Sequence, residues 1–107
     1  MVTLVDKIRL KPGIDPERFE RWVRESDYAA CPALPSLLSF GVARVTAEPG
    51  APFHYFEVIQ VTSAEAFARD MASETFRALV AAFGEMADVV ETFQGLRLEP
   101  GYARAPG

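Results

Sequence analysis

The sequence predicts an α+β domain with the ferredoxin-like element order β-α-β-β-α-β. Three features of the 107-residue chain lead to this fold class. Four stretches rich in β-branched and aromatic residues alternate like strands, and two stretches have helical periodicity. A short Pro-Gly turn joins the second strand to the third, so these two pair as a hairpin. The resulting antiparallel four-stranded sheet has the order 4-1-3-2, with the helices on one face.

The first strand and the first helix have clear boundaries. Residues 2–11 alternate between two faces, with Asp6 interrupting the more apolar one, and a Pro-Gly pair ends the strand. Asp15 can cap a helix whose first position is Pro16. The apolar stripe of this helix consists of Phe19, Trp22 and Val23. We expect the helix to end near residues 28–31, because the prolines that follow cannot continue it.

The second and third predicted strands, residues 36–46 and 53–61, flank a turn at Glu48-Pro49-Gly50. The third strand is apolar on both faces, which is typical of an inner strand that is covered on both sides. It nevertheless carries polar side chains, and buried polar groups need partners. These side chains are His54, Tyr55, Glu57 and Gln60.

The last third of the chain predicts a broken helix followed by a strand. Thr62 and Glu65 fit a capping box, and Ser73 can cap a second, longer helical segment. The apolar stripe of the longer segment contains Phe76, Leu79, Val80, Phe83, Met86, Ala87 and Val90. Residues 91–99 form the last predicted strand, in which Gly95 is expected to mark a bulge or a close approach.

Length and composition are typical of a single domain. We expect residues 1–107 to form it, with a core at 1–99 and a loose tail at 100–107. Half of the residues are hydrophobic, yet no run is long enough to span a membrane and no signal peptide is recognisable. The net charge of −4, with interleaved signs, argues against nucleic acids and anionic membranes as partners. The single cysteine, Cys31, excludes an internal disulfide and favours a cytoplasmic protein.

The residue inventory also limits what the chain can bind. One histidine and one cysteine provide no known metal-ligand spacing, and no glycine-rich phosphate loop is present, so we expect no metal and no cofactor. The sheet face opposite the helices carries too many apolar residues to lie bare in a monomer. We therefore expect a homodimer formed through this open sheet face.

Any acid-base chemistry must use carboxyl groups, tyrosines or the single histidine, His54. Glu57 is either a buried carboxyl of raised pKa that moves protons, or a structural partner of Lys7 or Arg9. The same ambiguity applies to Asp6. His54 and Glu57 point to opposite faces of a regular strand, so only a bulge would let both serve one site.

Asp27 and Tyr28 stand where the first helix gives way to a proline-rich loop, a frequent position for pocket residues. Local capping and loop anchoring explain them as well. Trp22 and the other aromatic residues either line a cavity for a planar ligand or fill the core. The candidates for catalysis are Glu57, His54 and Asp27, and those for substrate binding are Trp22, Tyr28, Tyr55, Phe40 and Phe83.

Three segments resemble the RedY-like family of the dimeric α/β-barrel superfamily. They are WVRESDY at 22–28, LPSLLSFGVARV at 34–45 and FHYFEVIQV at 53–61. The resemblance covers residues 2–99 and implies a homodimer whose two sheets close a barrel, with a pocket between sheet and helices in each protomer. The residues that match the motif positions are Trp22, Asp27, Tyr28, Tyr55 and Glu57, whereas His54 is only adjacent.

Members of this family occur in bacterial pathways for pyrrole- and indole-derived pigments. The resemblance therefore implies a role in secondary metabolism. Our first hypothesis is a cofactor-independent enzyme that binds a planar, partly apolar metabolite and catalyses an acid-base condensation, dehydration or cyclisation. Glu57 and His54 would move protons, while Asp27 and Tyr28 would orient the substrate. The alternatives are a cofactor-free monooxygenase and a non-catalytic ligand-binding dimer of unassigned role.

Overall fold

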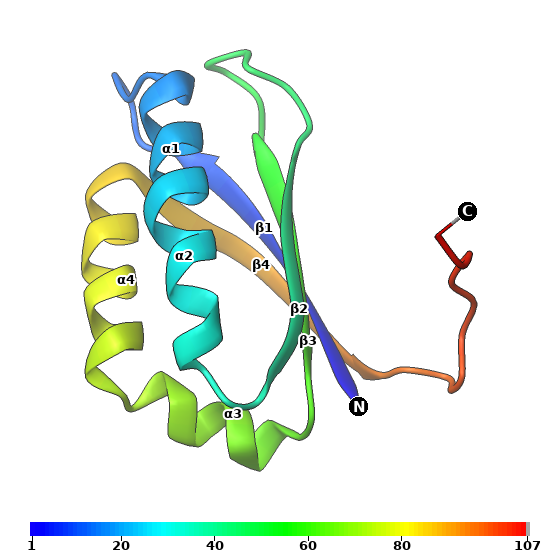
Figure 1. The fold of residues 1–107 in the computed structure, drawn as a ribbon. Helices are drawn as coiled ribbons and strands as arrows, with labels where there is room; N and C mark the ends of the chain where they lie inside the picture. The colour runs from blue at the N-terminus through cyan, green and yellow to red at the C-terminus, as the bar shows by residue number, and fades with distance from the viewer. Residues whose placement is uncertain (107) are drawn as a thin grey trace.

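Four antiparallel strands form one sheet in the computed structural model, which describes residues 1–106. The strands are β1 (Val2–Leu10), β2 (Leu37–Arg44), β3 (Tyr55–Val61) and β4 (Ala87–Leu96). Their order in the sheet is β2-β3-β1-β4, and the helices all lie on one side of it (Figure 1). The predicted ferredoxin-like α+β fold, with the first and third strands in the centre, is therefore confirmed.

The first helical segment is longer and less regular than a single α-helix. It runs through α1 (Pro16–Trp22), a π-helical turn η1 (Val23–Asp27), α2 (Tyr28–Ala30) and a 3-10 turn η2 (Cys31–Ala33). Asp15 caps it as predicted, because its carboxylate accepts a hydrogen bond of 2.9 Å from the N–H of Glu17. The sequence periodicity does not predict the π turn.

The second helical segment has the predicted break. It consists of α3 (Ala64–Met71) and α4 (Glu74–Met86). Ser73 caps α4 by accepting the N–H of Phe76 at 3.2 Å. The predicted capping box at Thr62 was wrong by one residue, because the hydroxyl of Ser63 accepts the N–H of Ala66 at 3.1 Å.

The boundary between α4 and β4 also differs from the prediction. The helix was expected to continue to Val90, but it ends at Met86, and Ala87 already pairs with Leu10 of β1. Apolar residues from Met86 onward fit helical spacing, yet Val89 and Val90 are β-branched and favour a strand. Pairing with the free edge of β1 decides between the two.

A bulge in β4 lies at Val90 and not at the predicted Gly95. Ile8 of β1 pairs with Val89, whereas Lys7 pairs with Glu91, so the strand carries one extra residue between these pairs. The extra residue reverses the faces of everything that follows it. Glu91 consequently points to the open face of the sheet and forms an ion pair of 2.8 Å with Lys7.

Two hydrophobic clusters hold the helices to the sheet. One lies at the α1 end of the sheet, and the other lies towards α3. The buried residues of the first are Ile8, Leu10, Phe19, Val23, Tyr55, Met86 and Ala87, and those of the second are Val2, Ile59, Val61 and Phe67. Between the two clusters, the helices leave a space above the middle of the sheet.

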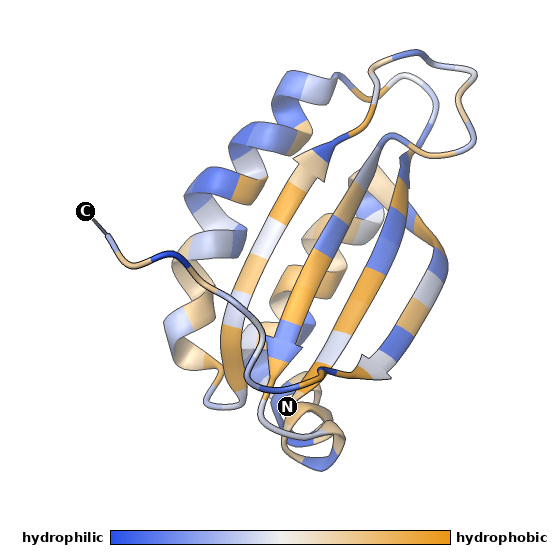
Figure 2. Cartoon of the chain, turned by 90° about the vertical axis from the view of Figure 1, so that its right-hand side faces the viewer, coloured by the Kyte–Doolittle hydropathy of each residue, from blue (hydrophilic) through white to orange (hydrophobic). Residues whose placement is uncertain are grey.

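No helix covers the opposite face of the sheet, which faces the reader in Figure 2. An apolar row crosses it at one register, from Val58 of β3 to Val5 of β1 and Phe93 of β4. Half of the surface of Phe93 is exposed. The predicted tail leaves β4 on this side, and its last residue, Gly107, lies outside the described residues (Figure 1). Among residues 1–106, no helix is long and apolar enough to cross a membrane.

Candidate functional site

A row of side chains crosses the middle of the sheet on the side that faces the helices. Glu57 of β3 pairs directly with Asp6 of β1, and Asp6 pairs with Thr92 of β4. The hydroxyl of Thr92 donates a hydrogen bond of 2.6 Å to the Asp6 carboxylate. Thr92 occupies this position because of the bulge at Val90. Without the bulge, Glu91 would pair with Asp6 instead.

The π turn brings a third acidic residue to this row from the helical layer. Trp22 and Asp27 are five residues apart, and both line the same cavity. In a regular α-helix two such residues point about 140° apart. The wider π turn η1 reduces this angle, which lets Asp27 share a face with Trp22. Cys31 follows one turn later and also lines the cavity.

The cavity between sheet and helices has a volume of about 440 Å³, which is within the usual range for small-molecule sites. Asp6, Asp27 and Glu57 all line it, together with Cys31 and Thr92. The rest of its lining is apolar and comes from every layer of the fold. These residues are Leu4, Trp22, Leu34, Leu37, Phe40, Ile59, Phe67, Met71, Phe76, Leu79, Val80, Phe83 and Val89.

Burial in this apolar cavity raises the pKa of two of its acidic groups. The pKa of Glu57 rises to about 9, first because of desolvation and then because the Asp6 carboxyl is both a hydrogen-bond partner and a like charge. The pKa of Asp27 rises to about 6, through desolvation alone. At neutral pH the cavity therefore contains a protonated Glu57 beside a largely ionised Asp27. A general acid and a general base need such a division of roles.

The structure does not bring His54 to this cavity. The side chain is buried at the start of β3, and both of its ring nitrogens have partners. Nδ1 accepts the backbone N–H of Leu10 at 3.0 Å, and Nε2 lies 2.8 Å from the carbonyl oxygen of Glu48. No bulge in β3 joins His54 to Glu57, so the pair considered for proton transfer is separated.

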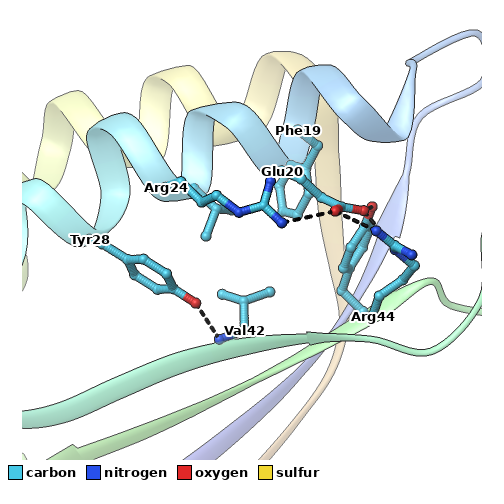
Figure 3. A pocket seen from close by; sticks show the side chains of 8 residues that line it. Phe19, Glu20, Arg24, Tyr28, Val42 and Arg44 are labelled. Carbon is cyan, nitrogen blue, oxygen red and sulfur yellow. Dashed lines mark hydrogen bonds and ion pairs between the residues drawn. The ribbon is translucent and has the colours of Figure 1, made fainter.

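Two of the candidate binding residues, Tyr28 and Tyr55, line a separate hollow of about 170 Å³ (Figure 3). The hydroxyl of Tyr55 donates to Glu20 at 2.8 Å, and Arg44 binds the same carboxylate through two hydrogen bonds of 2.6 and 2.7 Å. Bonding to Arg44 is the main reason why the pKa of Glu20 falls to about 2.

The other tyrosine of this hollow supports the sheet edge. The hydroxyl of Tyr28 accepts the backbone N–H of Val42 at 3.1 Å, as Figure 3 shows. Val42 belongs to β2, an edge strand whose outward N–H groups have no strand partner. The contact therefore ties the helical layer to the edge of the sheet.

The remaining candidates lie together. Trp22, Phe40 and Phe83 line the 440 Å³ cavity with Glu57 and Asp27. The role of Asp6 is ambiguous in the sequence alone, and nothing in the sequence points to Thr92, because its inward position depends on a bulge that no local signal marks. The apolar residues of α4 were assigned to the helix stripe, which gave no sign that part of the stripe faces a cavity.

The alternative structural role for Glu57 is not observed. Lys7 is paired with Glu91 on the open face, and Arg9 is exposed. In the part of the chain that the structure describes, no group of three or more His, Cys, Asp or Glu side chains is placed to hold a metal ion.

Comparison with known proteins identifies the family. The model of the RedY-like protein HapK matches residues 2–98. The chain belongs to the RedY-like HapK family. The crystal structure of HapK from Hahella chejuensis is 46% identical in sequence, covers 98% of this chain and 100% of its own, and has a TM-score of 0.93. No curated protein sequence matches this RedY-like chain.

More distant structures share the fold alone. SnoaB from Streptomyces nogalater, a cofactor-independent oxygenase, has a TM-score of 0.72 at 19% identity, over 92% of this chain and 94% of SnoaB. At3g17210 from Arabidopsis thaliana has a TM-score of 0.70 at 15% identity, over 98% and 100% of the two chains.

Replacing Glu57 by Gln is expected to stabilise the protein increasingly as the pH rises. The folded-state pKa of about 9 exceeds the ordinary 4.5, so the folded chain holds a proton that the unfolded chain releases. The wild type is therefore destabilised progressively between pH 4.5 and 9, and Glu57→Gln removes this cost. We expect a gain of about 4 kcal/mol at pH 8 and little gain at pH 4.5.

Urea unfolding at several pH values measures this difference. Glu85→Gln, which changes an exposed carboxyl on α4, is the matched control and should stay within about 0.5 kcal/mol of the wild type. A Glu57→Gln gain that does not depend on pH would contradict the raised pKa.

Replacing His54 by Ala should lower stability by about 1 to 3 kcal/mol, because the buried N–H of Leu10 loses its acceptor. Binding of indole to the cavity should stay unchanged in the folded variant. Glu48→Ala is the control, since His54 contacts only the backbone of Glu48. Loss of indole binding by a stably folded His54→Ala protein would show that His54 contributes to the site after all.

Proposed function

We propose that this protein is a small cofactor-independent enzyme that performs acid-base chemistry on a planar, largely apolar metabolite in the 440 Å³ cavity. The reaction class is a condensation, dehydration or cyclisation of a pyrrole- or indole-type intermediate. One observation carries the proposal: Asp6, Asp27 and Glu57 converge on an otherwise apolar cavity, and burial separates the pKa values of Glu57 and Asp27.

The roles follow from these protonation states. Asp27, ionised above pH 6, would take a proton from a substrate N–H or C–H group. Glu57, protonated below pH 9, would give a proton to a departing hydroxyl group, which leaves as water. The two transfers balance, so no external acid or base is consumed in a dehydration. The apolar walls exclude bulk water, which strengthens both interactions.

The cofactor-free monooxygenase remains the alternative, since SnoaB shares the fold. That reaction passes through a substrate carbanion or phenolate, which needs positive charge or hydrogen-bond donors nearby. Among the described residues that line the cavity, none is Lys, Arg or His. The acidic lining therefore favours the acid-base proposal. A non-catalytic binding protein is the third possibility; it would use the same acidic residues to hold a ligand without proton transfer.

The setting of the proposed reaction follows from family membership and composition. Membership of the RedY-like family, whose members occur in bacterial pigment pathways, supports a biosynthetic role in secondary metabolism. A single cysteine, without any disulfide, supports a cytoplasmic location.

We also propose the homodimer through the open sheet face. Val5, Val58 and Phe93 form one apolar row across that face, and no helix of the described chain covers it (Figure 2). An uncovered apolar face of this kind is unusual for a monomer. Two such sheets packed face to face would give each copy a second layer.

Turnover of a panel of pyrrole- and indole-type carbonyl compounds tests the enzymatic proposal. Activity should be highest between about pH 6 and 9 and fall about tenfold per pH unit outside this range, as the acid-base pair leaves its working state. Glu57→Gln and Asp27→Asn should each reduce turnover by a factor of about 100 or more while the fold is retained.

The control for this experiment is Glu25→Gln, an exposed carboxyl on the same helical segment as Asp27, which should keep full turnover. Stoichiometric oxygen consumption would support the monooxygenase alternative. Unchanged turnover in folded Glu57→Gln protein would rule out the acid role of Glu57.

Phe93→Glu should convert the dimer to a monomer, because it removes an aromatic side chain from the sheet-to-sheet contact and places there a charge that must be desolvated. Half of Phe93 is exposed in the single chain, so the substitution should not unfold it. Sedimentation velocity measures the change in mass, and Ala68→Glu at an exposed position of α3 provides the same charge as a control. A wild-type protein that sediments as one chain would contradict the dimer.

A further inference from the structure

We infer that the cavity selects a flat heteroaromatic ligand that presents a positively charged or N–H donor nitrogen to its acidic residues, and that it rejects ligands bearing a carboxylate. This inference rests on the proposed function, because it names the substrate class of the same cavity.

The charges that line the cavity are of one sign. Three acidic side chains face it, and no basic side chain of the described residues lines it. The nearby cations are engaged elsewhere. Lys7 pairs with Glu91 on the other face of the sheet, and the ammonium group of Lys11 binds the carbonyl of Gly84. Arg44 is held by Glu20 in the separate hollow.

The polar groups of the wall can accept hydrogen bonds but have few to give. The hydroxyl of Thr92 already donates to Asp6, and the thiol of Cys31 donates to the carbonyl oxygen of Asp27 at 3.4 Å. Glu57 has a single proton to give, and the neighbouring Asp6 carboxyl competes with a ligand for it. The capacity that remains for a ligand is mainly the carboxylate of Asp27 and the second oxygen of Glu57.

One neutral donor in the wall, the indole of Trp22, does not change this balance. A single N–H does not offset the charge of the neighbouring carboxylates in an apolar surrounding. A ligand carboxylate would meet like charges there, and its desolvation would go uncompensated. A ligand ammonium or N–H group would instead form a charge-assisted hydrogen bond with Asp27, which is stronger in a low-dielectric cavity.

The shape of the cavity specifies the rest of the ligand. The rings of Trp22, Phe40, Phe76 and Phe83 contribute to its walls, and these come from α1, β2 and α4. Aromatic walls favour a flat aromatic ligand through offset-stacked and edge contacts. Asp27 faces the polar row from the helical layer, so the ligand nitrogen would lie between Asp27 and this row while its rings contact the aromatic walls.

Four probes that share the indole ring test the inference. They are tryptamine, which is a cation, indole, which has only the ring N–H, 1-methylindole, which has no N–H, and indole-3-propionate, which is an anion. Their dissociation constants are measured with the full chain at pH 7.5 by calorimetry. Tryptamine should bind at least about tenfold more tightly than indole-3-propionate, and indole more tightly than 1-methylindole. An anion that binds as tightly as tryptamine would overturn the inference.

Two matched variants locate the effect. Asp27→Asn should weaken tryptamine about tenfold and leave 1-methylindole unchanged. Glu25→Gln removes the same charge from an exposed position two residues away and should alter tryptamine affinity less than twofold. If both variants weaken tryptamine equally, the preference comes from the overall charge and not from the cavity, and the inference fails.

The outcomes separate this inference from the proposed function. If indole-3-propionate binds best while Glu57→Gln still abolishes turnover, the ligand class is wrong and the enzymatic role stands. If none of the four probes binds and Glu57→Gln retains turnover, both are overturned. The order of the wild-type constants decides the ligand class even if a variant fails to fold.

Discussion

The site depends on one cross-strand pair of acidic residues in an apolar interior. Asp6 and Glu57 face each other on the two central strands, where like charges repel. The fold accommodates them by keeping a proton on Glu57, which costs about 3 kcal/mol of folding free energy at pH 7. That is a large share of the stability of a small domain. The next register position on the open face holds Val5 and Val58, so an apolar pair is compatible with these strands. The acidic pair therefore has a cost that the fold alone does not require.

Two backbone irregularities determine which acidic groups reach this pair. The bulge at Val90 turns Glu91 away to Lys7 and places Thr92 beside Asp6. The π turn η1 brings Asp27 in from the helical layer. A regular β4 would add a fourth carboxyl to the cavity, and a regular helix would direct Asp27 away from Trp22. Bulges and π turns cost regular hydrogen bonding and occur frequently at functional sites. Here both act on the same cavity.

Much of the fold follows from local sequence signals, and the site follows only in part. Strand alternation, the Asp15 cap and the break at Ser73 are local features, and the structure reproduces them. The end of α4 was missed because the residues around Val90 fit both helical and strand periodicity, and pairing with β1 decides between them. The π turn and the bulge were missed for a related reason. The bulge is defined by register with β1, and the π turn by a single wider turn between Val23 and Tyr28. Neither changes the local pattern of apolar residues.

The polar residues of β3 illustrate why the remainder required a structure. His54, Tyr55 and Glu57 all attract attention in the sequence for the same reason, since each is a polar group on a strand that is expected to be buried. The three residues differ in the hydrogen-bond partners that the structure gives them. His54 holds two backbone groups, and Tyr55 donates to Glu20, whose charge is neutralised by Arg44. Those networks are closed within the protein and stabilise it. The charged neighbours of Glu57, Asp6 and Asp27, are both acidic, and its side chain lines the cavity. Its network is therefore not closed by a cation of the protein, which is why we propose that a ligand provides the balancing group.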